Sequence, residues 1–253
     1  MSESVVGIIT ARMGSTRFPG KPIAPILGRP MIEHIYRRSR MAKTYAAVLV
    51  ATCDLAIREA AEAFGAPVVM TSDRHERAAE RAAEAAAART EDIAVLIQGD
   101  EPMVHPDMLD DLVAPLLQDP SLLCTNLMLP IGDEDARDPD QVKVVCDARG
   151  DALYMSREPL PTFRYKAPGP RWRQLGLIAF RREFLVRLMR MPSTPLERAE
   201  SVDMLRALEH GFPVRMVPTT HVTYAVDAPV DVARVEALMK DDPLLARYGD
   251  GRR

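Results

Sequence analysis

The stretch VVGIITARMGSTRFPGK, residues 5–21, decides the fold class that we expect. It begins with a short apolar run, Val5–Ile9, and passes directly into a loop that carries two glycines and three cations. A short, nearly continuous apolar run is typical of a strand buried on both faces of a parallel sheet. Loops at the carboxyl ends of such strands form the ligand crevice of open α/β sheets. The sequence therefore predicts an α/β fold with a ligand site at its first loop.

Short apolar runs alternate with longer amphipathic segments over the next part of the chain. We expect further strands at residues 47–51, 68–70 and 93–98. Helices are expected between the strands, at residues 31–42, 55–64 and 77–89, where good helix formers occur. This alternation predicts βαβ units with right-handed crossovers, and so a mostly parallel central sheet with flanking helices, in a Rossmann-like arrangement.

The pattern changes after Leu117, where short strands are linked by polar turns. Strands are expected at residues 124–129, 142–146, 152–154, 174–180 and 214–217. Residues 147–150, DARG, are typical of a hairpin connection, and a loop rich in proline and cations covers 159–173. Helices are expected at residues 181–189, 199–209 and 230–239. The sequence thus predicts one α/β domain over residues 1–253 with an antiparallel insertion.

Composition excludes several classes of protein. The chain has 253 residues, is 47% hydrophobic and has a formal net charge of -3. A nucleic-acid binder that neutralises phosphates usually carries a basic surplus, so we expect no nucleic-acid partner. No stretch approaches the roughly 18 to 20 apolar residues of a membrane span, so we expect no membrane partner and a cytoplasmic location. The three cysteines are far apart in the sequence, and no histidine lies near them at metal-ligand spacing. We therefore expect neither a zinc site nor a disulfide framework.

The loop after the first strand has two open interpretations. Arg12, Arg17 and Lys21 concentrate positive charge, and the glycines allow the backbone to approach a ligand closely. Ser15 adds a hydroxyl donor, so the loop suits a triphosphate, although the GxxxxGK[ST] order of a Walker A loop does not occur. From composition alone, a solvated basic loop is an equally good interpretation.

Two acids are candidate ligands of Mg²⁺. Asp100 follows the fourth apolar run, at the carboxyl end of a predicted central strand, and Asp227 follows residues 221–226. Mg²⁺ is usually held by one or two carboxylates together with substrate phosphates and water. The alternatives are a turn residue for Asp100 and a helix N-cap for Asp227, which precedes Ala228-Pro229.

In their order along the chain, these segments resemble one family. The motifs are ARMGSTRFPGKP (11–22), GRPMIEHI (28–35), VLVATCD (48–54), IQGDEPMV (97–104), QVKVVCDARGDALYMSREPLP (141–161) and YAVDAPVD (224–231). Their combination resembles the CMP-Kdo synthetases, the 3-deoxy-manno-octulosonate cytidylyltransferases. The resemblance implies a nucleotidyltransferase fold, CTP as donor, Mg²⁺ as cofactor and a homodimer. It also implies a nucleotide-binding part at about 1–117 and an acceptor and dimer part at about 118–230.

The resemblance also assigns roles on the nucleotide side. Arg12, Ser15 and Lys21 would bind the triphosphate, and Arg17 lies on the same loop. Gln98 would line the boundary between nucleotide and acceptor. The nucleoside-contacting segment of the family matches the positions of His75, Glu80 and Arg81. Asp100 and Asp227 would hold Mg²⁺, and the catalytic residues would be Arg12, Lys21 and Asp100.

The acceptor side departs from the family pattern. A family strand of the type His-Ile-Gly-Ile-Tyr is matched here by Gln174-Leu175-Gly176-Leu177-Ile178, and a Glu-Gln pair by Asp203-Met204. Gln174, Ile178 and Met204 would therefore line an altered acceptor pocket beside Arg157. In the nucleoside segment, Arg77-Ala78-Ala79 stands where the family has a Ser-Gly-Thr type run.

Further cations near this pocket are Arg164, Lys166, Arg171 and Arg173. Bidentate arginine contacts suit a compact polyanion, so we hypothesise a small anionic acceptor, such as the phosphonate phosphonoformate. Kdo or a related sugar acid is the alternative acceptor. Two rival classes are a non-catalytic nucleotide sensor and a guanylyl- or uridylyltransferase of similar architecture.

Overall fold

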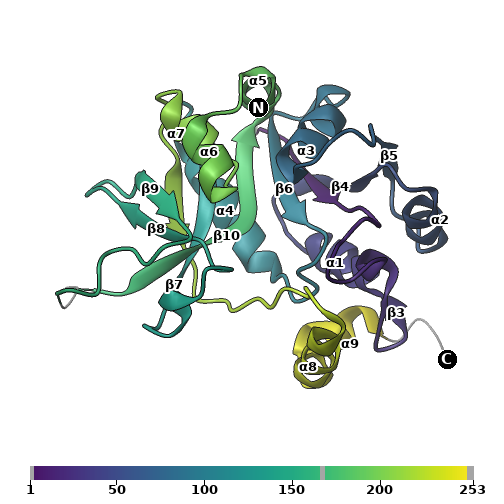
Figure 1. Cartoon of the computed structure of the whole chain (residues 1–253). Helices are drawn as coiled ribbons and strands as arrows, with labels where there is room; N and C mark the ends of the chain where they lie inside the picture. Colours follow the sequence, from purple (N-terminus) through teal and green to yellow (C-terminus); the bar gives the residue numbers. More distant parts are fainter. Residues whose placement is uncertain (1–2, 166–168, 250–253) are drawn as a thin grey trace.

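The computed structural model describes residues 3–165 and 169–249 and has a twisted sheet at its centre (Figure 1). Seven of the strands run in the order β11-β7-β10-β6-β1-β4-β5, while β8 pairs with β10 and β9 pairs with β8. The strands are β1 (Val5–Thr10), β4 (Tyr45–Thr52), β5 (Val68–Met70), β6 (Ile93–Gln98), β7 (Cys124–Ile131), β8 (Lys143–Cys146), β9 (Ala152–Ser156), β10 (Arg171–Arg181) and β11 (Arg215–Pro218). A separate small hairpin consists of β2 (Pro25–Ile26) and β3 (Arg29–Pro30).

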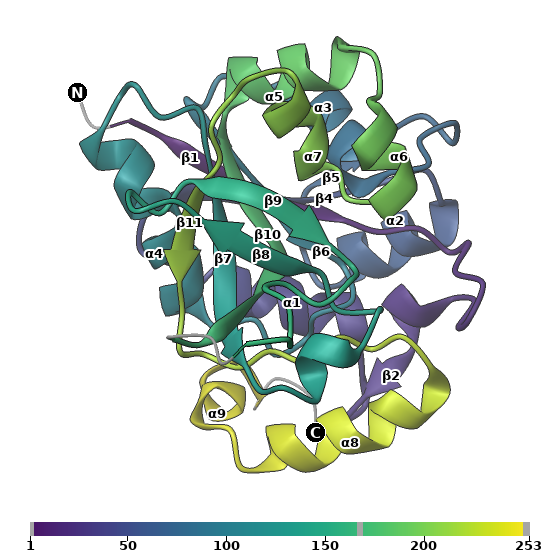
Figure 2. The same ribbon diagram turned by 60° about the vertical axis from the view of Figure 1, so that its left-hand side comes forward.

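Helices cover both faces of the sheet. They are α1 (Met31–Ser39), α2 (Leu55–Ala63), α3 (Ala78–Ala87), α4 (Pro106–Gln118), α5 (Arg182–Arg190), α6 (Pro195–Glu200), α7 (Met204–Glu209), α8 (Pro229–Lys240) and α9 (Pro243–Gly249). One core cluster contains buried side chains of α1, α2, α4 and α8, and the other contains those of α3, α5 and α7. In Figures 1 and 2, α5, α6 and α7 lie at the top and α8 and α9 at the bottom, with the strands between them.

The central strand β1 shows why short apolar runs form this sheet. Its six residues are buried, and successive side chains point to opposite faces. Val5 and Ile9 accordingly belong to one core cluster, and Val6 and Ile8 to the other. β1 pairs in parallel with both β4 and β6, whereas β10 runs antiparallel to β6 and β7. The predicted mostly parallel sheet with an antiparallel part is thereby confirmed.

Several predicted boundaries were wrong. The helix expected over 199–209 is two helices, α6 and α7, because Ser201 adopts a left-handed conformation with φ 55° and ends the first. The loop expected over 159–173 ends earlier, since β10 already begins at Arg171. The sequence interpretation did not predict α4, which begins at Pro106 with His105 as its N-cap. Among the described residues, no helix is long and apolar enough to cross a membrane.

The turn after β6 contains a glycine that the fold requires. A Cβ atom on Gly99 would lie 2.5 Å from the carbonyl oxygen of Thr10, which accepts a hydrogen bond from the Gly99 amide at 3.0 Å. This close approach holds the carboxyl ends of β1 and β6 together, next to the loop that follows β1.

We predict that Gly99→Ala lowers the free energy of unfolding by about 1 to 3 kcal/mol, the cost of forcing an extra methyl group into a packed site. Denaturant unfolding followed by circular dichroism would measure it. Gly132→Ala is the matched control, because a Cβ there meets no atom within 4 Å and its effect should stay within about 0.5 kcal/mol. Equal effects of the two variants would contradict the role given to Gly99.

Candidate active site

Three segments converge at the carboxyl ends of β1 and β6. Thr10 of β1 stands opposite Gln98 of β6, so the loop after each strand leaves the sheet at the same edge. The third segment, residues 219–228, is called the strap here and crosses this edge. The amide of Val226 in the strap donates a hydrogen bond of 2.9 Å to the carbonyl oxygen of Asp100. The site is therefore assembled from parts of the chain that are distant in sequence.

Lys21 lies at the centre of this convergence. Its Nζ is 2.8 Å from Asp100 Oδ2, 3.3 Å from Asp227 Oδ1 and 3.0 Å from the carbonyl oxygen of Val226. Gly20, with φ 77°, turns the chain so that a short 3₁₀ turn can begin at Lys21. The side chain of Lys21 is 13% exposed, which means that its charge is balanced mainly by the two carboxylates. Lys21, Asp100 and Asp227 form one cluster.

Two arginines extend the positive charge of the first loop. Arg17 lies 3.1 Å from Asp227 and 3.3 Å from Asp140. Arg12 and Arg17 both line a cavity beside the loop. The loop is anchored from outside by Asp54, whose carboxylate accepts a hydrogen bond of 2.8 Å from the amide of Met13. The loop is thus fixed by contacts with the rest of the fold, and it faces a cavity. This favours the ligand-binding interpretation over that of a solvated basic loop.

A cavity of about 310 Å³ adjoins this loop. The structure places seven of the eight residues that we predicted for the nucleotide in its wall: Arg12, Ser15, Arg17, Lys21, His75, Arg81 and Gln98. The two acids predicted for the metal, Asp100 and Asp227, line it as well. Cations, carboxylates and an amide thus face one space that can receive a nucleotide.

Hydrogen bonds hold the part of this cavity wall that contains His75 and Arg81. Arg81 is buried and donates to Thr71 Oγ1 at 2.5 Å and to the carbonyl oxygen of Ser72 at 3.3 Å. His75 is paired with Glu84. Glu80 does not line the cavity; its carboxylate accepts a hydrogen bond from the amide of Arg77 at the start of α3.

A larger cavity of about 830 Å³ continues from the smaller one. Arg12, Arg17, Gln98, Asp100 and Asp227 line both cavities, so a group bound in one would meet a group bound in the other at these residues.

Three of the four residues predicted for the acceptor line the larger cavity, namely Arg157, Gln174 and Ile178. Gly176 makes room for Gln98, because a Cβ atom at position 176 would overlap the side-chain amide of Gln98.

Three interpretations of single residues need correction, and a fourth stays a prediction. Met204 is 1% exposed within a core cluster and lines neither cavity, because α7 begins one residue after the cavity-lining Asp203 and turns Met204 inward. Arg171 lies outside both cavities and pairs with Asp133 at 3.0 Å. Asp227 is not the N-cap of α8, which is Ala228. Lys166 lies outside the described residues.

The sequence interpretation missed an ion pair in the larger cavity. Arg77 lies 2.6 Å from Asp203, and both side chains line the cavity. Burial raises the pKa of Asp203, while the adjacent Arg77 opposes this shift. In the sequence, Arg77 stands out only as a departure from the family pattern. The pairing of residues so distant in sequence gives no local signal, so only the folded chain reveals it.

Glu101 is a buried acid beside the cluster. It is 8% exposed and accepts a hydrogen bond of 2.5 Å from the hydroxyl of Thr223 in the strap. Burial raises the pKa of Glu101 to about 7, and the nearby charges of Asp100 and Asp227 add to the shift. Glu101 thus holds the strap against the turn that carries Asp100.

The comparisons with known proteins point to one family. The family model for cytidylyltransferases matches residues 6–216. The 3-deoxy-manno-octulosonate cytidylyltransferase of Myxococcus xanthus is 48% identical over 93% of this chain and 96% of its own length. The enzyme of the same name from Geobacter metallireducens is 44% identical over 91% of this chain and 96% of its own length.

Two solved structures extend the comparison. A CMP-Kdo synthetase complexed with CTP is similar with a TM-score of 0.90 and 37% identity, over 94% of this chain and 98% of that one. A structure from Bacillus anthracis, described as that of a glucose-1-phosphate thymidylyltransferase, shares the fold at a TM-score of 0.66 and 15% identity, over 94% of this chain and 96% of its own.

The fold and the site define a nucleotidyltransferase that uses CTP, a cytidylyltransferase. Within this class, the chain belongs to the CMP-Kdo synthetase family.

The raised pKa of Glu101 gives a prediction for stability. Between the ordinary value of 4.5 and about 7, the folded protein binds a proton that the unfolded chain has released, so the free energy of unfolding should fall as the pH rises through this window. Glu101→Gln should remove this fall and gain about 3 kcal/mol over the wild type between pH 4.5 and pH 8.

Urea unfolding at a series of pH values, with EDTA present, would measure this difference. The exposed Glu134 provides the control Glu134→Gln, which should follow the wild type. A wild-type curve that runs parallel to that of Glu101→Gln would contradict the prediction.

Proposed function

We propose that this cytidylyltransferase transfers the CMP group of CTP to 3-deoxy-manno-octulosonate, Kdo, and releases pyrophosphate. One observation carries the proposal: Lys21, Asp100 and Asp227 meet at the junction of two connected cavities. The smaller cavity, with Arg12 and the first loop, would take the nucleotide. The larger cavity would take the acceptor. The relatives named above, which are 3-deoxy-manno-octulosonate cytidylyltransferases, support Kdo in this role.

The reaction needs little covalent chemistry from the protein. A hydroxyl oxygen of the acceptor forms a bond to the α-phosphorus of CTP and gives its proton to solvent water, while the bond from that phosphorus to the pyrophosphate oxygen breaks and pyrophosphate leaves. Positioning and electrostatic stabilisation supply most of the acceleration in such transfers. Arg12 and Lys21 would offset the charge that develops on the leaving pyrophosphate. Gln98, at the boundary of the cavities, would orient the two substrates.

The residues present fit Mg²⁺. Oδ1 of Asp100 is buried and has no hydrogen-bond partner among the described residues, as expected of an oxygen that is available to a cation. Asp227, 39% exposed, adds a second carboxylate on the same cluster. Hard oxygen ligands of this kind are what Mg²⁺ prefers. Asp100 and Asp227 would hold the ion, which, when bound, offsets phosphate charge and makes the acceptor hydroxyl more acidic.

The larger cavity offers polar partners for a sugar acid. Arg157, Arg173 and Gln174 line it, and Gln174 is oriented by a 2.8 Å hydrogen bond to Oδ1 of Asn126. The ion pair of Arg77 and Asp203 adds polar groups where Ile178 provides none. A polyhydroxylated acid therefore finds hydrogen-bond partners here. The relatives reported above give no support to the phosphonate acceptor that we hypothesised from the sequence.

An assay of pyrophosphate release tests the acceptor. With CTP and Mg²⁺, the purified protein should turn over with Kdo, and it should not do so with phosphonoformate. Turnover with phosphonoformate alone would contradict the proposal. CTP binding by calorimetry, without pyrophosphate release under any condition, would instead indicate a nucleotide sensor. Offering ATP, GTP and UTP beside CTP distinguishes a guanylyl- or uridylyltransferase.

We predict that Asp100→Asn abolishes turnover and leaves the fold intact, because the cluster loses a charge while the side-chain shape is kept. The exposed Asp111 provides the control Asp111→Asn, which should keep wild-type turnover. Initial rates of pyrophosphate release, together with circular dichroism, would measure both. An active Asp100→Asn enzyme would remove Asp100 from the catalytic machinery.

Lys21→Ala should reduce turnover by about 10²- to 10³-fold, which is the scale of losing one stabiliser of transition-state charge. Lys240→Ala is the control, since Lys240 is exposed at the end of α8. Single-turnover rates at saturating CTP would separate this effect on the chemical step from weaker binding. A loss seen only in the KM for CTP would assign Lys21 to ground-state binding.

Two expectations from the sequence stay predictions. One is the homodimer, for which sedimentation analysis of the full chain is the measurement. The other is the cytoplasmic location, for which cell fractionation is the measurement.

A further inference from the structure

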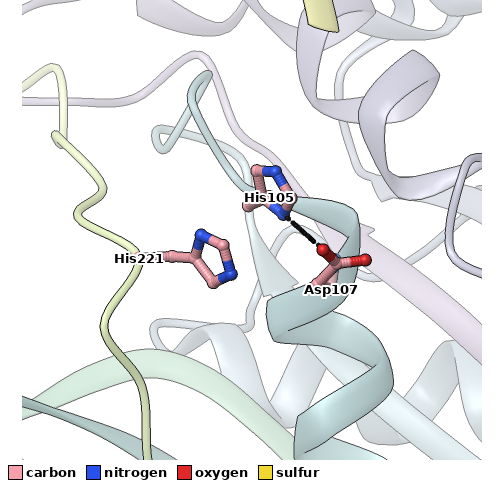
Figure 3. Close-up of side chains that lie close together, drawn as sticks. All are labelled: His105, Asp107 and His221. Carbon is pink, nitrogen blue, oxygen red and sulfur yellow. Dashed lines mark hydrogen bonds and ion pairs between the residues drawn. The ribbon is translucent and has the colours of Figure 1, made fainter.

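Two histidines and an aspartate gather outside both cavities (Figure 3). One ligand atom each from His105, Asp107 and His221 can be chosen so that all three lie within 4.8 Å of one another. The imidazole rings of His105 and His221 are stacked, with centroids 4.1 Å apart and planes inclined by 9°. Nδ1 of His105 is 3.6 Å from Oδ2 of Asp107. From the sequence alone, neither histidine had suggested a metal site.

The three side chains are mounted on well-anchored backbone. His105 is the N-cap of α4, and its Nδ1 accepts a 3.2 Å hydrogen bond from the amide of Asp107. His221 lies in the strap, where its own amide donates to Thr219 Oγ1 at 3.2 Å. Within residues 3–165 and 169–249, its imidazole makes no hydrogen bond, so its ring nitrogens are available to another group. The backbone therefore needs no rearrangement to present all three side chains together.

The ligand set selects a class of ion. Two imidazoles and one carboxylate are ligands of zinc and similar divalent transition metals, whereas Mg²⁺ prefers oxygen alone. Zinc binds nitrogen and oxygen at about 2.0 to 2.2 Å. The three ligand atoms lie within 4.8 Å of one another, so side-chain rotations of His105, Asp107 and His221 would bring them to one ion. Three protein ligands leave the fourth position to water.

The surroundings of His105 favour the neutral form of its imidazole. Burial, and then the charge of His221, lower the pKa of His105, as does Arg38 more weakly, although Asp107 and Asp242 oppose the shift. A neutral imidazole has a lone pair for a metal, and a protonated one has none.

We propose that His105, Asp107 and His221 bind one divalent transition-metal ion of the zinc class, separate from the carboxylate site for Mg²⁺. The ion would join the strap to the start of α4. Both segments continue into the active site, since Asp100 precedes His105 and Asp227 follows His221 along the chain. The strap already contacts the turn after β6 through Val226 and Thr223. The ion would be a third connection between the segments that carry Asp100 and Asp227.

Equilibrium dialysis tests the site without any need for activity. The full chain is stripped with EDTA, placed in excess Mg²⁺ and dialysed against Zn²⁺, and bound zinc is measured by elemental analysis. We expect one Zn²⁺ per chain. His221→Gln and His105→Asn should each weaken binding by about tenfold or more, since even losing an outer partner of a metal ligand costs about 10- to 100-fold. Asparagine at 105 keeps an acceptor suited to the N-cap, so the fold should persist.

Control variants exclude other sites. His210→Asn removes an exposed histidine, and Cys53→Ser removes a partly exposed thiol, and both should bind zinc as the wild type does. Thermal unfolding gives a second readout: Zn²⁺ should raise the Tm of the wild type and of His210→Asn and leave that of His221→Gln unchanged. Less than one zinc per chain, or equal affinity in the wild type and His221→Gln, would overturn the proposal.

Discussion

Lys21 occupies a position that only the balance of three charges makes stable. A mostly buried ammonium is costly unless carboxylates compensate it, and Asp100 and Asp227 do so at 2.8 and 3.3 Å. The carboxylates in turn depend on Lys21, because two acids next to each other would otherwise repel. This cluster ties together the loop after β1, the turn after β6 and the strap. Residues of all three segments line the smaller cavity or the larger one.

The sheet supplies the precision that this cluster needs. β1 and β6 are parallel neighbours, and the contact of Gly99 with Thr10 fixes where both strands end. On the other side of β6, Gly176 of β10 gives Gln98 room to stand between the two cavities. Gly99 and Gly176 thus leave the space in which polar side chains of the site are positioned. Transfer of a nucleotidyl group depends on such positioning more than on a special nucleophile.

The strap links the active site to α8. It holds Glu101 through Thr223 and Asp100 through Val226, and it carries Asp227 into the cluster. It then continues into α8, where the carboxylate of Asp231 accepts hydrogen bonds from the amides of Asp227 and Ala228. The direction of Asp227 is therefore set by both ends of one extended segment. A metal at His105 and His221 would add to the same restraint.

The sequence by itself determined the order of β1, α1, β4, α2, β5, α3 and β6, and most of the charged residues that line the smaller cavity. Apolar runs buried on both faces and a cationic loop after β1 are local signals, and they survive folding unchanged. The second half was harder to predict: Ser201 breaks one helix into α6 and α7, and Met204 turns into the core, because tertiary packing decided both. Only the tertiary structure brought Arg77 to Asp203 and His105 to His221. Such pairs join residues far apart in the chain, and no pattern of neighbouring residues encodes a distance across the fold.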